Sequence, residues 1–187
     1  MIRSFLAIEL PKLILRKIEE VQEDLRLTHA DVRWVNPEKI HLTLKFFGNI
    51  EESRIDAIFK AIEEPIQNNP PFFLNVRGVG AFPQMRNPRV IWMGLVNGKE
   101  VLVSLQKQIE IQLEKIGFQP EDRPFHPHLT LGRMRSSRGK EELVGGMEKH
   151  RDEEFGDFQI ERVVLFKSDL RPTGPVYTPL REIKLGT

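Results

Sequence analysis

The chain has 187 residues, of which 40% are hydrophobic and 29% charged, and its formal net charge is +1. This length is enough for one domain with a sizeable core, and the near-zero charge excludes a general electrostatic attraction to nucleic acid, so an anionic partner must be met by locally grouped cations. The sequence contains no cysteine, which excludes disulfides, thiolate metal sites and a cysteine nucleophile. No apolar run approaches the roughly 18 residues of a membrane span, so we expect a cytoplasmic protein without membrane contact.

The first half of the chain alternates strand and helix patterns. Strand-like apolar runs occupy residues 2–10, 33–35, 40–48 and 72–82. Apolar residues spaced by three and four predict amphipathic helices at 12–26 and 51–62. We expect Asn49 to cap the second helix, and Pro65, Pro70 and Pro71 to close it.

The second half follows the same order. A strand pattern at 89–96 leads through Asn97-Gly98 into a helix at 101–116 that Gly117 ends. A strand at 125–135 and a weaker helix within 136–146 follow, and alternation predicts one strand over 158–170. After a turn at 171–175, the last strand covers 176–185.

One four-residue phrase occurs twice: residues 41–44 read His-Leu-Thr-Leu, and residues 128–131 repeat it letter for letter. Side chains of a strand alternate between its faces, so in each copy histidine and threonine share one face and the leucines face the core. The copies lie about half the chain apart and the order of elements around them repeats, which indicates an internal repeat of about 1–87 and 88–187. We therefore predict an α+β fold over 1–187: a single bilobal domain with a pseudo-two-fold axis, antiparallel sheets, outer helices and a central cleft.

Two such strands on opposite walls of a cleft would place His41 and His128 on either side of one phosphate group. An imidazole titrates near neutral pH, so a neutral ring can take a proton from water while a charged ring gives one to the leaving oxygen. Thr43 and Thr130 can donate hydrogen bonds to the non-bridging oxygens and stabilise the developing charge. This chemistry needs no metal, and we expect no cofactor.

The surroundings of the two phrases carry a family resemblance. The chain resembles the 2H phosphoesterase superfamily, which is named after two His-x-Thr motifs, and within it the RNA 2′,3′-cyclic phosphodiesterases, also called 2′–5′ RNA ligases. The resemblance covers nearly the whole chain and rests on these segments: 3–8 (RSFLAI), 41–48 (HLTLKFFG), 80–83 (GAFP), 88–92 (PRVIW), 126–133 (HPHLTLGR) and 165–168 (LFKS).

This resemblance implies hydrolysis of a 2′,3′-cyclic phosphate at an RNA end to a 2′-phosphate, with His41 as proton donor to the leaving 3′ oxygen and His128 as proton acceptor. It implies that Arg133 clamps the phosphate, although simple alternation places Arg133 on the strand face opposite to His128. It also implies the reverse reaction, 2′–5′ ligation with an RNA 5′-hydroxyl in place of water, on partners such as tRNA halves and with no obligate protein partner. The identical phrases themselves do not decide which histidine is the acid.

Three other interpretations stay open at this point. The enzyme can be a cyclic phosphodiesterase of small nucleotides, or the chain can be a module that binds RNA ends or nucleotides without turnover. Alternatively, His126 with His128 and His41 has the His-x-His plus distant His pattern of a zinc site. Against zinc, Lys39 occupies the position equivalent to His126 in the first copy.

Further side chains are candidates for contacts to RNA. Five cations can neutralise backbone phosphates, although each is equally typical of ordinary surface: Arg33, Lys45, Arg86, Arg89 and Arg135. Four aromatic side chains can stack on a base, although a core role is the more ordinary one: Trp34, Phe46, Phe82 and Trp92.

Overall fold

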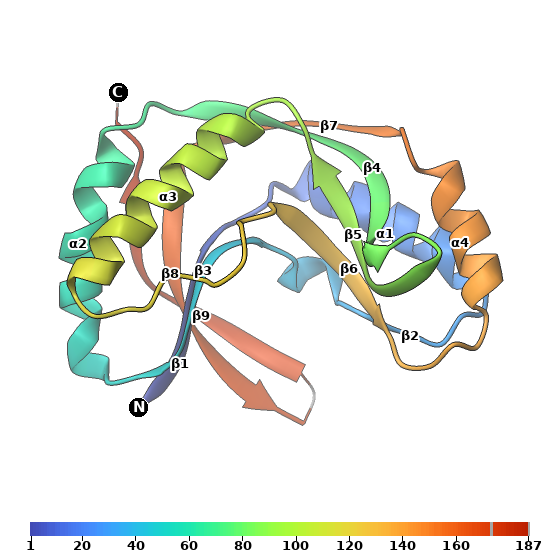
Figure 1. Ribbon diagram of the computed structural model, residues 1–187, viewed down its shortest axis with the longest axis horizontal. Coiled ribbons are helices and arrows are strands. Elements are labelled where there is room, and N and C mark those ends of the chain that lie inside the picture. Colours follow the sequence, from blue (N-terminus) through green and yellow to red (C-terminus); the bar gives the residue numbers. More distant parts are fainter. Residues whose placement is uncertain (173, 187) are drawn as a thin grey trace.

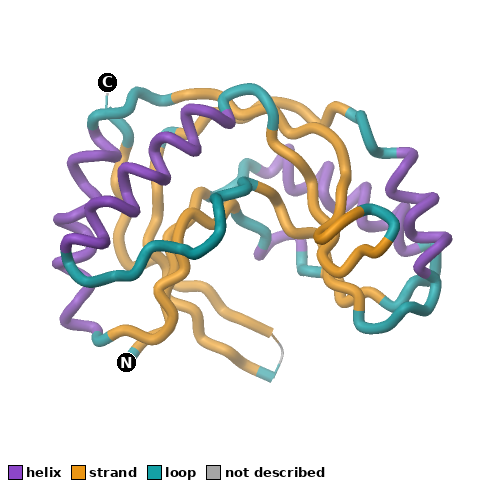
Figure 2. The backbone as a smooth tube through the Cα atoms, viewed as in Figure 1, coloured by secondary structure: helices purple, strands orange, loops and turns teal. Residues whose placement is uncertain are grey.

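Two lobes form an arch in the computed structural model, which describes residues 1–172 and 174–186 (Figure 1). Each lobe has an antiparallel sheet with helices on its outer side, so that strands occupy the middle of the molecule and helices its two ends (Figure 2). The predicted α+β fold with two antiparallel sheets and outer helices is confirmed. Among the described helices, none is both long enough and apolar enough to cross a membrane.

The first lobe has a four-stranded sheet in the order β3-β1-β8-β9 and carries helices α2 and α3. Its elements have these bounds: β1 Ile2–Ile8, β3 Leu42–Ile50, α2 Ile55–Gln67, α3 Lys99–Lys115, β8 Arg162–Arg171 and β9 Gly174–Lys184. Short 3₁₀ turns precede β3 and α2: η1 Pro37–Lys39 and η2 Glu52–Arg54.

The second lobe has a five-stranded sheet in the order β2-β6-β5-β4-β7 and carries helices α1 and α4. Its elements have these bounds: α1 Lys12–Arg26, β2 Val32–Trp34, β4 Phe72–Gln84, β5 Asn87–Leu95, β6 His128–Met134, α4 Lys140–Lys149 and β7 Glu154–Ile160.

Neither lobe is built from one half of the chain. Strand β1 of the first lobe pairs with β8 from near the end of the chain, and β4, which precedes the midpoint, pairs with β5 and β7 in the second lobe. Helix α1 contacts α4 and β7, while α3 contacts α2 and β3. Each lobe therefore contains strands from both halves of the chain. The single bilobal domain over 1–187 and its internal repeat of about 1–87 and 88–187 stay predictions.

Helix α1 has the predicted bounds and packs against the motif strand β6 of the second lobe. Its inward face buries Ile14, Ile18 and Leu25 completely, as the spacing of three and four requires. Gln22 is buried on the same helix, and its Nε2 donates to the carbonyl oxygens of Val35 (2.8 Å) and Leu131 (2.9 Å). This amide therefore fixes α1 against the second copy of the repeated phrase.

The predicted limits of α2 are wrong at both ends. Asn49 does not cap the helix, because it still pairs in β3, and the helix begins after the 3₁₀ turn without a side-chain cap. Pro65 lies inside the last turn and does not end the helix, which continues to Gln67. The fully buried Ile66 anchors this last turn in the core, and tertiary packing of this kind outweighs the missing N–H of one proline.

The single strand predicted over 158–170 is two strands in two different sheets. β7 ends at Ile160 in the second lobe, and β8 begins at Arg162 in the first. In β8 the odd-numbered Val163 and Leu165 join the main core, while Val164 and Phe166 pack in a separate cluster on the other face. Alternation did not reveal the break because both faces of β8 are apolar. Thr173, in the turn predicted at 171–175, lies outside the described residues.

Candidate active site

A cleft of about 860 Å³ lies where the two sheets face each other. His41, Thr43, His128, Thr130 and Arg133 all line it. His41 immediately precedes β3 of the first lobe and Thr43 lies at its start, and the other three come from β6 in the second. The structure therefore brings together the five residues that were predicted to act on the phosphate.

Each motif histidine is oriented by a carbonyl two residues earlier in the chain. Nδ1 of His41 lies 2.9 Å from the carbonyl oxygen of Lys39, and Nδ1 of His128 lies 2.6 Å from that of His126. A carbonyl oxygen only accepts, so Nδ1 carries the hydrogen in both rings. Nε2 is left as the atom that can exchange a proton with a ligand, and it is equivalent in the two copies.

His41 lies among aromatic rings. It stacks on Phe5 with a centroid distance of 4.6 Å, and Tyr177 meets it edge-on at 5.2 Å. Burial lowers the pKa of His41 below 6.5, and the hydrogen bond to the Lys39 carbonyl, which raises the pKa, offsets this only in part. The ring is therefore neutral at neutral pH until an anion binds beside it.

His128 has a positively charged neighbourhood. Burial lowers its pKa, the hydrogen bond to the His126 carbonyl raises it, and the charges of Arg133 and His126 lower it further. The ring of Phe82 meets His128 edge-on at 5.0 Å and completes the wall. The two imidazoles are thus identical in local sequence and different in electrostatics, since a cation acts on His128 alone.

A β-bulge in β6 directs Arg133 into the cleft. Thr130 is paired with Trp92 of β5 but Gly132 with Ile91, so one extra residue, Leu131, is inserted in β6. A bulge shifts the alternation by one position. Arg133 therefore lies on the side of Thr130, which overturns the expectation that it faces away from His128.

The first copy of the phrase has a bulge at the equivalent position. In β3, Thr43 pairs with Ala7 and Lys45 with Leu6, so the extra residue is Leu44. The residue that occupies the place of Arg133 is Phe46, which lines the cleft and is 42% exposed. One wall of the cleft therefore presents an arginine where the other presents an aromatic ring.

Comparison with known proteins identifies the family. The profile described as LigT-like phosphoesterase matches residues 8–92 and 95–177. The chain belongs to this family. The resemblance to the 2H phosphoesterases is therefore confirmed, and the protein is a phosphoesterase.

Two relatives match this phosphoesterase over nearly its full length. It is 34% identical over 184 residues to a protein of Methanothermobacter thermautotrophicus named RNA 2′,3′-cyclic phosphodiesterase, covering 98% of this chain and 99% of the relative. It is 32% identical over 186 residues to a protein of the same name from Aquifex aeolicus, covering 99% of this chain and 98% of the relative.

Solved structures of the same fold include TT0787 of Thermus thermophilus, with a TM-score of 0.80, 27% identity and 97% of each chain covered. E. coli LigT complexed with 3′-AMP has a TM-score of 0.77 and 25% identity, with 100% of this chain and 99% of that chain covered. The likeness to both extends through the two lobes, so it includes both walls of the cleft.

Only some of the other cations proposed for RNA contacts line the cleft. Arg89 lines the cleft of this phosphoesterase. Lys45 also lines it, but its ammonium group is buried and bonds Glu110 (3.0 Å) and the carbonyl oxygen of Gln119 (2.7 Å). Three candidates do not line the cleft and are exposed: Arg33, Arg86 and Arg135.

Only some of the aromatic candidates for base stacking line the cleft. Phe46 and Phe82 line the cleft, Trp92 lines a neighbouring groove, and Trp34 packs against the core. Two further residues of the cleft were not predicted: Tyr177, which comes from β9 and contacts His41, and Arg123 in the loop before β6. No local pattern marks either residue, since each reaches the cleft only through the way distant segments are brought together.

The proposed zinc arrangement does not form among the described residues. His126 lines the cleft beside His128, but no three His, Asp or Glu side chains of 1–172 and 174–186 gather closely enough to hold a metal ion. His126 instead contributes its carbonyl oxygen to the orientation of His128.

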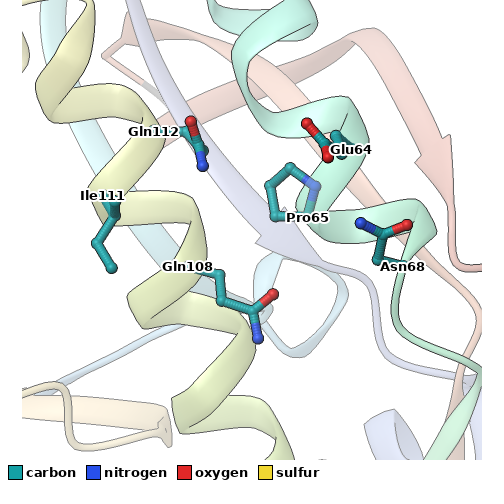
Figure 3. Close-up of a pocket in the computed structure, with 6 residues that line it drawn as sticks. All are labelled: Glu64, Pro65, Asn68, Gln108, Ile111 and Gln112. Atoms are coloured by element: carbon teal, nitrogen blue, oxygen red, sulfur yellow. The ribbon is translucent and has the colours of Figure 1, made fainter.

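A smaller cavity of about 160 Å³ lies on the outer helices, away from the motif strands (Figure 3). Its lining comes from α2, the end of that helix and α3: Glu64, Pro65, Asn68, Gln108, Ile111 and Gln112. None of these six residues is an imidazole or a cation, so this cavity offers no positive charge that would bind a phosphate.

Proposed function

We propose that this phosphoesterase hydrolyses 2′,3′-cyclic phosphates at RNA ends to 2′-phosphates, with His41 as the acid and His128 as the base. The observation that carries the proposal is the convergence of two equally oriented histidines from opposite lobes on one cleft, together with Thr43, Thr130 and Arg133. The relatives named RNA 2′,3′-cyclic phosphodiesterase, and the capture of 3′-AMP by LigT, support a nucleotide phosphate as the group that this cleft receives.

The reaction needs one proton transfer at each wall of the cleft. His128 Nε2 takes a proton from water, whose oxygen attacks phosphorus, and the bond from phosphorus to the 3′ oxygen breaks. His41 Nε2 gives its proton to that oxygen, which leaves a 3′-hydroxyl and a 2′-phosphate. The attacking and leaving oxygens lie roughly in line across phosphorus, so a base and an acid on opposite walls suit this displacement. Thr43, Thr130 and Arg133 are placed to stabilise the non-bridging oxygens.

The electrostatic difference between the rings supports this assignment of roles. The charge of Arg133 acts on His128 and lowers its pKa, which favours the neutral ring that a base requires. No such cation acts on His41, and an anionic phosphate beside it raises its pKa, so substrate binding promotes the protonated ring that an acid requires.

The test is product analysis on a short RNA with a 2′,3′-cyclic end, which resolves a 2′-phosphate from a 3′-phosphate. We expect the 2′-phosphate, and a decrease in kcat of about 10² to 10⁴ in His41→Ala and in His128→Ala. His29→Asn is the matched control, since His29 is exposed and lies outside the cleft. Unchanged turnover in both alanine variants, with normal folding, would remove the catalytic assignment and leave an RNA-end binding module.

Two additional assays separate the remaining alternatives. Exclusive turnover of cyclic mononucleotides would reject RNA ends as the substrate and favour a phosphodiesterase of small nucleotides. Full activity after treatment with EDTA is expected, whereas a zinc mechanism predicts its loss. The ligation of tRNA halves and a cytoplasmic location stay predictions.

A further inference from the structure

The cleft continues past His128 into a second groove. This groove has a volume of about 520 Å³ and lies over β4 and β5 of the second lobe. Three residues line both cavities: Phe82, His126 and His128. The point where the cavities join is therefore the imidazole that we assign as the base.

Strand register shows that the groove is an extension of the catalytic face of the same sheet. Directly opposed residues of antiparallel strands point to the same side. His128 is paired with Gly94, and Thr130 with Trp92, which is in turn paired with Gly80 of β4. The face that presents His128 and Thr130 thus runs across two neighbouring strands without a break.

An aromatic platform lies on this extension. The ring of Trp92 covers Gly80 so closely that a Cβ atom there would overlap it. Phe82 lies beside Trp92 with a centroid distance of 5.3 Å and a tilt of 41°. Aromatic faces in a groove are the usual partners of unstacked nucleic-acid bases.

The rim of the groove is mainly basic. Three cations line it, Arg77, Lys99 and Arg151, with Asp152 as the carboxylate among its lining residues. Arg77 faces Glu154 at 3.4 Å and Arg151 faces Glu148 at 3.2 Å, both exposed pairs. Lys99 takes part in none of the ion pairs formed by the described residues. Its charge is thus available to a phosphate.

We propose that this groove binds the 5′-terminal nucleoside of a second RNA strand, whose 5′-hydroxyl replaces water in the reaction. The inference rests on the proposed function and on His128 as its base. In-line geometry places the attacking oxygen on the side of His128 and leaves the cyclic end on the side of His41. Whatever lies directly beyond His128 is therefore the group bonded to the attacking oxygen, and a nucleoside fits a groove with an aromatic floor and a basic rim.

The ligation step balances without any further reactant. The 5′ oxygen of the second strand attacks phosphorus and its proton passes to His128 Nε2. The bond from phosphorus to the 3′ oxygen breaks, and that oxygen takes the proton of His41 Nε2. The product is a 2′–5′ phosphodiester with a free 3′-hydroxyl, and the two histidines have exchanged protonation states.

The experiment measures hydrolysis and ligation in the same mixture, with a cyclic-ended RNA oligomer and increasing concentrations of an RNA oligomer with a 5′-hydroxyl. The variants are Trp92→Leu, which removes the platform, and Lys99→Glu, which reverses one rim charge at the start of α3. Lys107→Glu is the matched control, because it makes the same charge change on the same helix outside the groove. We expect the ratio of ligation to hydrolysis to fall about tenfold in Trp92→Leu and severalfold in Lys99→Glu, with the control at the wild-type ratio.

Five outcomes of this experiment, repeated with a cyclic mononucleotide as substrate, distinguish the possibilities. Selective loss of ligation in the groove variants supports the inference, and the unaffected Lys99→Glu hydrolysis shows that the fold is intact. An unchanged ratio in both variants overturns it. Loss of oligomer hydrolysis with retained mononucleotide hydrolysis also overturns it, because the groove then holds the strand that carries the cyclic end. A wild-type enzyme that hydrolyses but never ligates overturns the inference alone, whereas absence of hydrolysis overturns the proposed function itself.

Discussion

At the scale of single residues, His41 and His128 occur in the same four-residue motif, but their imidazoles lie in different electrostatic environments. Both donate Nδ1–H to a carbonyl two residues earlier, so both offer Nε2 to a ligand. Aromatic rings surround His41, whereas His128 faces the charge of Arg133. The two copies of the motif therefore provide imidazoles with different proton affinities. An acid and a base that act in the same step require such a difference.

The first prediction concerns the pH dependence of kcat/KM, which reports the free enzyme. Activity needs His128 neutral and His41 charged. With increasing pH, kcat/KM therefore rises as His128 loses its proton and falls as His41 loses its proton. Both pKa values are lowered from 6.5, so the bell-shaped profile has its maximum below pH 6.5. The profile of kcat lies at higher pH, because bound phosphate raises the pKa of both rings. A profile that is flat from acid to alkaline pH contradicts the pair.

The second prediction assigns one limb of that profile to Arg133. Removing its charge in Arg133→Ala raises the pKa of His128, because Arg133 contributes to holding that pKa down. The rising limb of kcat/KM therefore shifts to higher pH, the falling limb stays in place, and KM increases through the lost phosphate contact. Arg135→Ala is the control, since Arg135 lies outside the cleft. Equal displacement of both limbs would show that Arg133 does not act on His128 in particular.

At the scale of elements, one buried ion pair holds the loop that leads to β6. Lys45 lies in β3 with 4% of its side chain exposed, and it bonds Glu110 of α3 and the carbonyl oxygen of Gln119. Gln106, also buried, joins Glu110 (3.1 Å) to the carbonyl oxygen of Leu44 (3.3 Å). These bonds hold β3, α3 and the loop at Gln119 together. This loop lies in the segment that leads from α3 to His128 in β6.

The third prediction is that Lys45→Ala lowers the free energy of unfolding by about 3 kcal/mol or more, because it leaves the largely buried carboxylate of Glu110 without its cation. KM also increases, since the loop around Gln119 loses its anchor. Chemical denaturation measures the first effect and steady-state kinetics the second. Lys17→Ala is the control, because its pair with Glu20 is exposed and contributes at most about 1 kcal/mol. Similar losses in the two variants would show that the buried pair has no special role.

The fourth prediction concerns His150, which joins α1 to α4. Its Nε2 lies 2.8 Å from Asp24 and its Nδ1 contacts Glu153. Burial alone lowers its pKa, but the hydrogen bonds and charges of Glu153 and Asp24 outweigh burial, and the pKa is raised above 6.5. The group therefore adds stability below pH 6.5 and loses that contribution as pH rises through the raised value.

Denaturation at a series of pH values between about 5.5 and about 9 tests this linkage. The difference in unfolding free energy between the wild type and His150→Gln is expected to be largest at the acid end and to shrink towards the alkaline end. Glu153→Gln removes one partner and reduces the difference. A difference that does not change with pH would mean that His150 contributes by packing and not by charge.

At the scale of the whole molecule, charge is nearly balanced and yet concentrated locally. The chain has 28 basic and 27 acidic residues. The cleft nevertheless gathers five cations and one carboxylate in its lining: Lys39, Lys45, Arg89, Arg123, Arg133 and Glu121. Glu110 neutralises Lys45, and Glu121 offsets one of the four remaining cations, so the net attraction for an RNA phosphate is about that of the three arginines. The attraction for RNA is therefore confined to the cleft, and we expect the affinity for RNA to depend only modestly on salt concentration.

The fifth prediction follows from this count of arginines. The slope of log KM against log salt for a cyclic-ended oligomer is expected to be at most about 2, and Arg89→Ala lowers it by about 0.7, the amount typical of one phosphate contact on a single strand. Arg86→Ala, in the exposed turn between β4 and β5, is the control and leaves the slope unchanged. An identical slope in Arg89→Ala would show that Arg89 does not contact the RNA backbone.

The sequence by itself determined the elements whose signal is local. Helix α1 follows from apolar residues three and four apart, and the two motif strands follow from alternation, so the faces of His41, Thr43, His128 and Thr130 were predictable. Both signals depend on neighbours within a few positions. The repeated phrase then pointed to a pair of facing strands and to the family that the comparisons confirm.

The tertiary structure alone decided which pieces meet. The bulges that turn Arg133 and Phe46 into the cleft depend on the pairing of two strands, and the break between β7 and β8 depends on the chain crossing from one lobe to the other. Tyr177 reaches His41, and Trp92 comes to floor a groove beside His128, from segments remote in sequence. No local pattern carries such contacts, because they arise only when strands of both halves share a sheet, and it is these contacts that make two identical histidines chemically unlike.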